Sequence, residues 1–173
     1  AVEALADLSE DDPEALRRFL THERADVRAR AGAALAELGA PDAEADLVRA
    51  LDDPGAVVRR SAATTLGWWF PRRRNAELRR LLQDADPDVR LAAADALALV
   101  EDDAALDVLR QRVRAGRTDD AWEQAFSRLA RLAGPADRDL LAARAGWPNR
   151  RRRRAAALAG LARLGAAAAV QTL

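Results

Sequence analysis

The sequence DADPDVRLAAADALALV, residues Asp84–Val100, decides the fold of this chain. Asp86 and Pro87 are typical of a helix start, because aspartate caps free N–H groups and proline is tolerated at the first helical position. Apolar residues then follow at steps of three or four, which is the spacing of one face of an α-helix. The stretch therefore predicts a turn followed by an alanine-rich amphipathic helix.

The same pattern occurs twice upstream at a constant distance. Val27, Val58 and Val89 are each 31 residues apart, and the arginine after each valine keeps the same step. A fixed period of about 20–50 residues indicates stacked units that bury their apolar faces against one another. The repeat therefore predicts a quasi-linear array of similar units.

The period divides the chain into about five helical hairpins, which at this size stack into an α-solenoid. We expect an all-α, right-handed solenoid forming a single domain over residues 1–173. In the second helices we expect Leu38 and Trp69 to point into the core with the repeated leucines. The expected hairpins span 13–39, 42–70, 72–100, 102–133 and 135–165, with partial or capping helices at 1–8 and 166–173.

The pattern D-x-D-P-x-V-R-x-x-A-A-x-A-L, from Asp84 to Leu97, resembles a HEAT repeat. It is similar to the short bacterial form that also occurs in phycobilin-lyase-type proteins. The resemblance is close in the first three hairpins and weaker in the last two, where the Val-Arg pair is lost or displaced. It implies a HEAT-like solenoid whose second helices line the concave face.

The resemblance also implies that the repeated aspartates and arginines form a ladder between adjacent hairpins. The spacing fits, because Asp53 precedes Arg59 by six residues, as Asp84 precedes Arg90. His22 holds the equivalent place before Arg28, which predicts a structural role for this histidine. In the fourth hairpin Trp122 and Gly116 hold the two places, so the ladder is expected to stop there.

Composition excludes several classes of function. The chain has no cysteine and one histidine, which removes disulfides, thiolate metal sites and most zinc chemistry, so no cofactor is expected. Half of its residues are apolar and 32% are charged, as in folded soluble proteins. It has neither an apolar run of membrane-spanning length nor a signal-peptide pattern, and we expect a cytoplasmic protein without membrane contact. It does not begin with methionine, which is consistent with a fragment.

The net charge of zero conceals a gradient along the chain. Residues 1–53 carry 14 acidic residues against 6 arginines, whereas residues 140–173 carry 7 arginines and no acidic residue. Two interpretations remain open: oriented association with an anionic partner or another copy, or two simply solvated ends. The sequence does not indicate the oligomeric state.

Helical spacing predicts which side chains the second helices present to a partner. If the repeated valines and leucines point inward, then Trp68 and Leu99 point outward, with polar groups around them. An apolar patch ringed by hydrogen-bonding groups is typical of a protein-binding surface, unless the loop after Trp69 folds back over Trp68. The predicted partner-binding residues are Thr64, Trp68, Asp95, Leu99, Ser127, Arg128 and Arg131.

Two arginine clusters form a second candidate site, for a polyanion. Arginines in the first turn of a helix are unfavourable unless an anion compensates them, because the helix dipole is positive there. Arginines beside tryptophan also suit nucleic acids, although charge runs are usually solvated. The predicted anion-binding residues are Arg72, Arg73, Arg74, Arg150, Arg151, Arg152, Arg153 and Arg154.

The sequence favours a non-catalytic scaffold that binds a protein partner along its concave face. The alternative is a binder of nucleic acid or another polyanion through the arginine-rich turns. A third hypothesis is an enzyme: alkylpurine DNA glycosylases are built on HEAT-like repeats, and Asp95, Trp68 and Arg128 are similar in residue type to their site. Nothing in the sequence predicts a shifted pKa for Asp95, so no catalytic residue is assigned.

Overall fold

The computed structural model describes residues 12–115, 120–145 and 151–164, and every regular element within these ranges is helical. The chain divides into two compact units, residues 1–100 and 101–173, and each is described by itself. Consecutive helices form hairpins, which confirms the predicted all-α class. The expected terminal helices at 1–8 and 166–173 lie outside the described residues. No described helix combines the length and apolar character that a bilayer crossing requires.

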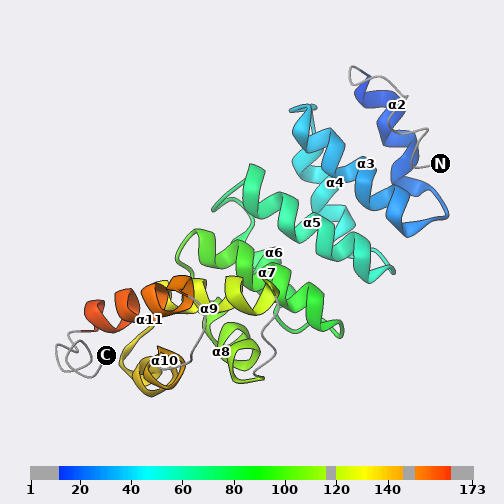
Figure 1. The fold of residues 1–173 in the computed structure, drawn as a ribbon. Helices are drawn as coiled ribbons and strands as arrows, with labels where there is room; N and C mark the ends of the chain where they lie inside the picture. Colours follow the sequence, from blue (N-terminus) through cyan, green and yellow to red (C-terminus); the bar gives the residue numbers. More distant parts are fainter. Residues whose placement is uncertain (1–11, 116–119, 146–150, 165–173) are drawn as a thin grey trace. The chain divides into compact units, whose positions relative to one another are not determined.

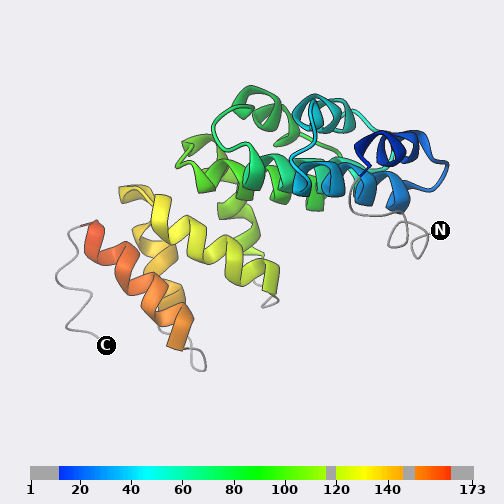
Figure 2. The same cartoon turned by 90° about the horizontal axis from the view of Figure 1, so that it is seen from above.

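The first unit consists of three helical hairpins arranged in two layers (Figures 1 and 2). Its second helices pack side by side in the order α3, α5, α7, and the first helices pack against them from one side. The first helices are α2 (Pro13–Arg17, extended by a 3₁₀ turn at Arg18–Thr21), α4 (Ala43–Ala50) and α6 (Asn75–Leu81). The second helices are α3 (Ala25–Glu37), α5 (Ala56–Trp69) and α7 (Pro87–Leu99).

The helix starts predicted from the Asp-Pro pairs are confirmed at two places. Asp86 Oδ1 accepts from the backbone N–H of Asp88 at 2.8 Å, and Asp12 Oδ1 accepts from Glu14 at 3.0 Å. Each aspartate thus satisfies an N–H group that the first helical turn leaves without a partner. At the other end of α3, Gly39 ends the helix with a φ of 62°, a conformation that glycine adopts without strain.

The core of the first unit follows the 31-residue period. Val27, Leu35, Leu66 and Leu97 are completely buried, as the apolar spacing predicts. Where α5 meets α7 the backbones approach closely, since a Cβ added to Gly67 would lie 2.5 Å from Ala96 Cβ. Small residues at these inward positions therefore set the distance between neighbouring second helices.

The predicted burial of Leu38 and Trp69 is wrong. Their exposed fractions are 40% and 52%. The cause is a length mismatch: α4 has 8 residues and α5 has 14, or about 12 Å against about 21 Å at 1.5 Å per residue. A short loop joins the end of α4 to the start of α5, so the first helix does not cover the last turn of the second.

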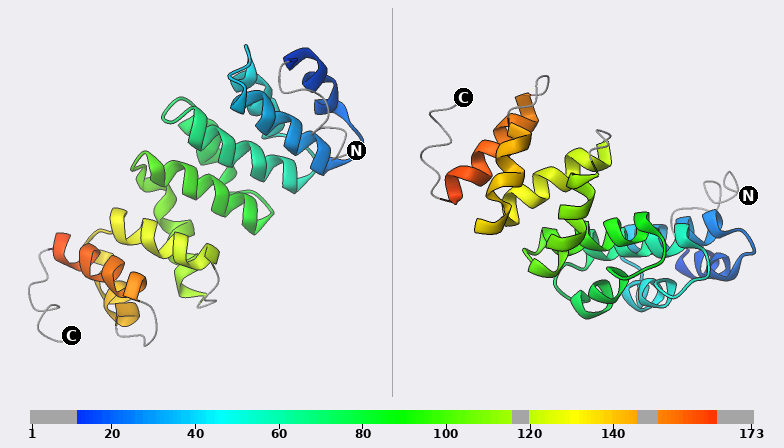
Figure 3. Two further views of the ribbon diagram at one scale, coloured as in Figure 1. Left: turned by 45° about the horizontal axis from the view of Figure 1, so that its top comes forward. Right: turned by 90° about the horizontal axis from the view of Figure 1, so that it is seen from below.

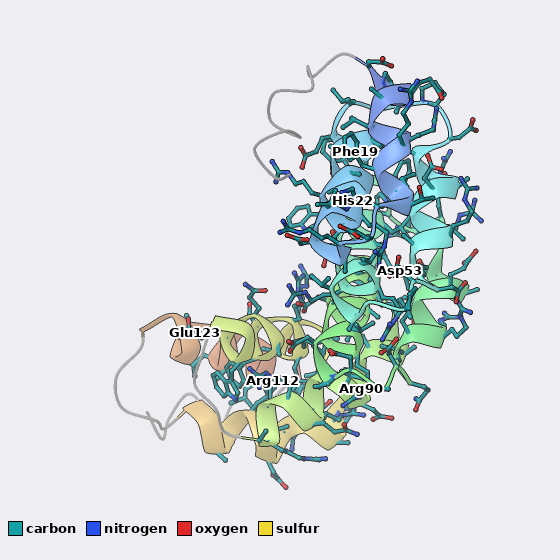
Figure 4. All side chains as sticks on the ribbon, turned by 90° about the vertical axis from the view of Figure 1, so that its right-hand side faces the viewer. Phe19, His22, Asp53, Arg90, Arg112 and Glu123 are labelled. Carbon is teal, nitrogen blue, oxygen red and sulfur yellow. The ribbon has the colours of Figure 1, made fainter. Side chains whose placement is uncertain are left out.

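The Asp–Arg ladder joins the hairpins of the first unit as the resemblance implied. Arg28 donates from Nε and Nη2 to both carboxylate oxygens of Asp53, each at 2.8 Å. Arg59 makes the same pair of bonds to Asp84, at 2.8 and 2.9 Å. Through Nη1 each arginine also donates to two carbonyls of the loop before its own helix. One guanidinium thus fixes the loop before its own helix and the loop of the next hairpin. Figure 4 shows two of the loop residues, His22 and Asp53, one after the other along the first unit.

His22 occupies the first ladder place with a structural role. Its Nδ1 accepts the backbone N–H of Arg24 at 3.1 Å, just as Asp53 Oδ1 accepts that of Gly55 at 2.7 Å. The ring therefore stabilises the loop before α3 in the way that the aspartates stabilise the later loops. His22 also lies against Phe19, with ring centroids 6.2 Å apart.

The second unit contains two further hairpins (Figure 3). Helix α9 (Asp120–Leu132) packs against α8 (Leu106–Arg114) and α11 (Arg151–Arg163), and α10 (Arg138–Ala145) packs against α11. Short 3₁₀ turns, Asp103–Ala105 and Pro135–Asp137, precede α8 and α10. The core includes fully buried Leu109, Leu129 and Leu141.

Trp122 takes the ladder place in the second unit, as the sequence predicts, and is completely buried. Its ring stacks on Phe126 with centroids 5.0 Å apart, and Nε1 donates to the Val113 carbonyl at 3.0 Å. A ring and one hydrogen bond thus replace the ladder arginine. The equivalent of the ladder aspartate, Gly116, lies outside the described residues.

An ion pair between α8 and the 3₁₀ turn before α10 joins the two hairpins of the second unit. Arg110 donates from Nε and Nη2 to the two carboxylate oxygens of Asp137, at 2.6 and 3.0 Å. Asp137 is 1% exposed, and it also accepts the backbone N–H of Gly134. The hydrogen bonds from Arg110 hold the pKa of this carboxyl below its ordinary value, against the opposing effect of burial.

Candidate functional site

Two tryptophans on the last turn of α5 are exposed. Trp68 has an exposed fraction of 66% and Trp69 of 52%, which makes Trp68 the more exposed of the two. Indole rings are normally among the most buried side chains, because each can remove about 150–250 Å² from water. Two exposed rings on one helical turn therefore point to a surface that is covered in a complex.

The loop after α5 does not cover Trp68. Phe70 instead packs against the apolar cluster that contains Leu35 of the preceding hairpin and Ala43 at the start of its own hairpin. Arg73 and Arg74 reach Glu44 in the same direction, with Nη1–Oε2 and Nε–Oε1 distances of 2.8 and 2.6 Å. The chain is therefore held against the preceding hairpin, and the alternative in which the loop shields Trp68 is wrong.

The close contact between Gly67 and Ala96 locates Trp68 relative to α7. Trp68 follows Gly67 directly, and Leu99 lies one helical turn beyond Ala96. Trp68 and Leu99 hold equivalent places in neighbouring parallel repeats, on helices whose axes are about 8–10 Å apart. Leu99 is half-buried, so the leucine that the sequence predicts to be exposed beside Trp68 is only partly exposed.

Leu38 extends the apolar surface to the other side of α5. It precedes Trp69 by one repeat, and α3 packs directly against α5. We call Leu38, Trp68, Trp69 and Leu99 the Trp68 patch. Sequence reasoning missed Leu38 and Trp69, and the signal that could have found them is the shortness of the first helices.

Polar side chains border the Trp68 patch toward the middle of the helices. Thr64 is exposed one turn before Trp68 on α5, and Asp95 is half-buried one turn before Leu99 on α7. The predicted residues Thr64, Trp68, Asp95 and Leu99 thus all belong to the last two turns of two packed helices. The structure brings these four together.

The other predicted partner-binding residues lie on α9 in the second unit. Ser127, Arg128 and Arg131 line a shallow, open pocket of about 270 Å³ together with Gln124. Ser127 and Arg131 are exposed and Arg128 is half-buried. The structure therefore brings these three together as a polar, basic group within the second unit.

The arginines at 72–74 are not a free cationic cluster. Glu44 pairs with both Arg73 and Arg74, and Arg74 also pairs with Glu77 at 3.3 Å. These hydrogen bonds hold the pKa of Glu44 below its ordinary value, Arg74 contributing more than Arg73. Arg72 is exposed, with a left-handed backbone at φ 69°. The ion pairs of this turn with Glu44 therefore connect the second and third hairpins.

The second arginine cluster lies mostly beyond what can be described at the side-chain level. Arg150 is outside the described residues. Arg151, Arg152, Arg153 and Arg154 begin α11, as the sequence predicts, but their side chains are outside the described part of the chain. Their role as an anion site stays a prediction.

Comparison with known families covers the first unit. Residues 13–73 match a family model described as HEAT repeats, and residues 76–100 match one described as HEAT repeat. These residues belong to the HEAT-repeat family. The matched HEAT repeats coincide with the three hairpins that carry the Asp–Arg ladder, and they include the whole Trp68 patch. No curated protein matches the chain.

Proposed function

We propose that this HEAT-repeat chain is a non-catalytic scaffold that binds a protein partner through the Trp68 patch. The observation that carries the proposal is the exposure of Trp68 and Trp69 on one turn of α5. Covering the exposed part of one indole would contribute about 3 kcal/mol before the costs of association. Tryptophans in such positions are the usual energetic centres of protein interfaces.

The chemistry of the patch supports binding rather than catalysis. Its four side chains are apolar, and the adjacent Thr64 and Asp95 contribute one hydroxyl and one carboxyl. Acyl or phosphoryl transfer would need an activated nucleophile or a metal, and base excision would need a positioned general base. The glycosylase hypothesis has its own assay: release of a modified base from DNA by the purified chain would contradict the non-catalytic proposal.

We also propose the cytoplasmic location and the short bacterial repeat form that the sequence predicts. The scaffold would act in the cytoplasm, and its repeats would be of the short bacterial kind that phycobilin-lyase-type proteins share. That similarity concerns the repeat alone, so it supports the fold and not a lyase activity.

The experiment compares three forms of the chain as bait: the wild type, Trp68→Ala and Val57→Ala. Val57 is a matched control because it is an exposed apolar residue (37%) at the opposite end of the same helix. A native partner should be captured by the wild type and by Val57→Ala, and its capture by Trp68→Ala should fall at least tenfold, which corresponds to about 1.4 kcal/mol.

The salt dependence of binding by the purified pair separates this proposal from polyanion binding. Binding through the Trp68 patch should change little between about 50 and 200 mM salt, whereas phosphate-dominated binding should weaken tenfold or more. Equal capture by all three baits, with unchanged helicity, would contradict the assignment of the patch. Steep salt dependence that is insensitive to Trp68→Ala would favour the arginine-rich turns.

A further inference from the structure

The end of α5 that carries the two exposed tryptophans is negative as well as apolar. The aligned peptide dipoles of a helix place a partial negative charge at its C-terminus, which a basic residue in the last turn commonly offsets. The last turns of α2, α4 and α6 each contain such an arginine. Those of α3 and α5 contain no basic residue. The two second helices that carry Leu38, Trp68 and Trp69 therefore end without a cation of their own.

The last carbonyls of α5 also lack hydrogen-bond donors within the part of the chain that the structure describes. These carbonyls belong to Gly67, Trp68 and Trp69. Pro71 has no N–H, so it cannot donate to the Gly67 carbonyl as a residue continuing the helix would. The next turn closes on itself instead, since the Arg73 N–H donates to the Phe70 carbonyl at 3.3 Å. Acceptor groups thus lie directly beside the two exposed indoles.

Helix α3 shows what a closed end looks like. The N–H of Gly39 donates to the Ala36 carbonyl at 3.0 Å, and that of Ala40 donates to the Leu35 carbonyl at 2.9 Å. These bonds are made possible by the left-handed backbone of Gly39. The end of α5 has no glycine at the equivalent place and does not form this pair of bonds.

Glu37 adds a full negative charge next to this end. It is the last residue of α3 and is exposed, and it precedes Trp68 by one repeat. Because α3 packs directly against α5 (Figure 2), Glu37 and Trp68 are close enough for one long side chain of a partner to reach both. Among the described residues, none forms an ion pair with Glu37.

We propose that the end of α5 binds a basic segment of the protein partner, with an arginine side chain stacked on an exposed indole of the Trp68 patch. This inference rests on the proposed scaffold function and names the chemistry of the partner. A guanidinium fits all three features of the site: its charge faces Glu37, its plane covers an indole, and its N–H groups donate to the free carbonyls of α5.

The charge of the surrounding sequence favours the same kind of partner. Residues 1–53 carry 14 acidic residues against 6 arginines, so this end of the chain attracts cations. Arg72 is the opposing feature, an exposed basic residue three positions after Trp69, and an acidic partner would depend on it. One cationic contact adds little salt dependence, in contrast to a row of phosphate contacts.

The test titrates the full chain with two short peptides whose ends are blocked and whose central residue is flanked by leucines. The central residue is arginine in one peptide and citrulline in the other, which keeps the shape of arginine but has no charge. Nuclear magnetic resonance follows the indole N–H of Trp68, assigned by its loss in Trp68→Ala. The arginine peptide should give a saturable shift and bind about tenfold more tightly than the citrulline peptide. Equal affinity would overturn the proposal.

Substitutions locate the contact. Glu37→Gln should weaken the arginine peptide about threefold at low salt and leave the citrulline peptide unchanged. Glu23→Gln, at an exposed glutamate before the other end of α3, makes the same charge change and should alter neither peptide. Trp68→Ala, followed at the indole of Trp69, should weaken the arginine peptide about fivefold or more. Equal losses in the two glutamate variants would overturn a local site in favour of general charge attraction.

Three further outcomes would overturn the proposal. The first is the absence of a saturable shift with millimolar arginine peptide. The second is tighter binding of a glutamate-centred peptide that Arg72→Gln abolishes, which would assign an acidic partner. The third is self-association of the chain that Trp68→Ala abolishes, since a second copy would then occupy the site.

Failure of this inference is distinguishable from failure of the scaffold proposal. If native-partner capture depends on Trp68 but the arginine and citrulline peptides bind equally, the scaffold function stands and the arginine contact is wrong. If the arginine peptide binds through Glu37 but capture ignores Trp68→Ala, the assignment of the Trp68 patch as the partner-binding surface is wrong.

Discussion

At the scale of single residues, the ladder arginines combine two tasks that a lysine would not perform together. Arg59 donates to two carbonyls of its own loop and to both oxygens of Asp84. The hydrogen bonds from the arginine hold the pKa of Asp84 below its ordinary value, and burial opposes this effect. Asp53 behaves in the same way beside Arg28. The repeated charges of this chain are therefore structural connectors.

The lowered pKa values predict a loss of stability in acid. A carboxyl whose pKa is lower in the folded chain than in the unfolded chain stabilises the fold fully above about pH 4. That contribution is lost as the pH falls further and the folded-state carboxyls take up protons. Urea unfolding of the wild type should therefore show a falling free energy of unfolding below about pH 4.

The substitution Asp84→Asn tests how much of this acid-induced loss of stability comes from the Arg59–Asp84 ion pair. It should lower the free energy of unfolding by about 1–3 kcal/mol at neutral pH, because Arg59 loses its ionised partner. The difference in the free energy of unfolding between the wild type and the variant should shrink in acid, because the Asp84 carboxyl of the wild type then becomes protonated. Asp88→Asn, at a 71% exposed side chain four residues later in the first turn of α7, is the control and should change stability little. A pH-independent deficit would contradict the assignment to ionisation of Asp84.

At the scale of helices, the spacing of α5 and α7 depends on Gly67. A Cβ there would lie 2.5 Å from Ala96 Cβ and 2.9 Å from Ala96 Cα, so the helices would have to separate. Gly67→Ala should lower the free energy of unfolding by about 1–3 kcal/mol, even though alanine favours a helix more than glycine does.

Gly32→Ala on α3 is the matched control for this prediction. A Cβ at Gly32 would meet Leu47 Cδ2 at 3.4 Å, which is ordinary contact. The better helix propensity of alanine should then raise stability by about 0.5–1 kcal/mol. Thermal and urea unfolding of both variants provide the measurement, and equal effects at the two glycines would contradict the close approach at Ala96.

Sequence periodicity predicts the elements well and their ends less well. The 31-residue step places the second helices and their buried leucines correctly, because burial of one helix face dictates the spacing of apolar residues. It fails at Leu38 and Trp69, since periodicity describes the direction of a side chain and not whether a neighbouring helix reaches that far. Trp68 itself was predictable, because it lies on the face opposite to Leu66.

At the scale of the whole molecule, the chain has two units that each possess a core. Leu35, Leu66 and Leu97 belong to the first, and Trp122 and Leu129 to the second. Repeat proteins unfold through nearest-neighbour interactions, so a local defect affects the hydrogen bonds of its own surroundings most. Each core is therefore expected to respond to substitutions within its own unit.

Native-state hydrogen exchange tests this expectation. Gly67→Ala should lower the protection of amides in α5 and α7 by the same free energy that unfolding measures, while amides in α9 and α11 should keep their protection. In Gly160→Ala the new Cβ would lie 2.8 Å from the Ala130 carbonyl. This variant should lower the protection of amides in α9 and α11 and leave that of amides in α5 and α7 unchanged. Uniform loss of protection along the chain in either variant would show that the units open together.

The sequence predicts the residues of the Trp68 patch better than the ion pairs of the neighbouring arginine-rich turn. The position of Trp68 and Leu99 follows from the repeat, whereas the pairing of Arg73 and Arg74 with Glu44 does not, because residues 29 and 30 positions apart meet only in the stacked fold.

The contrast between Trp122 and the exposed pair on α5 also gives the chain built-in optical reporters. The chain contains no tyrosine, so its near-ultraviolet emission comes almost entirely from indoles. Trp68 and Trp69 lie open to solvent and to collisional quenchers such as acrylamide, whereas Trp122 is enclosed and stacked on Phe126. Once the fourth tryptophan, Trp147, is replaced by phenylalanine, quencher accessibility follows the coverage of the α5 end without any attached dye, and emission from the enclosed ring follows the integrity of the second unit.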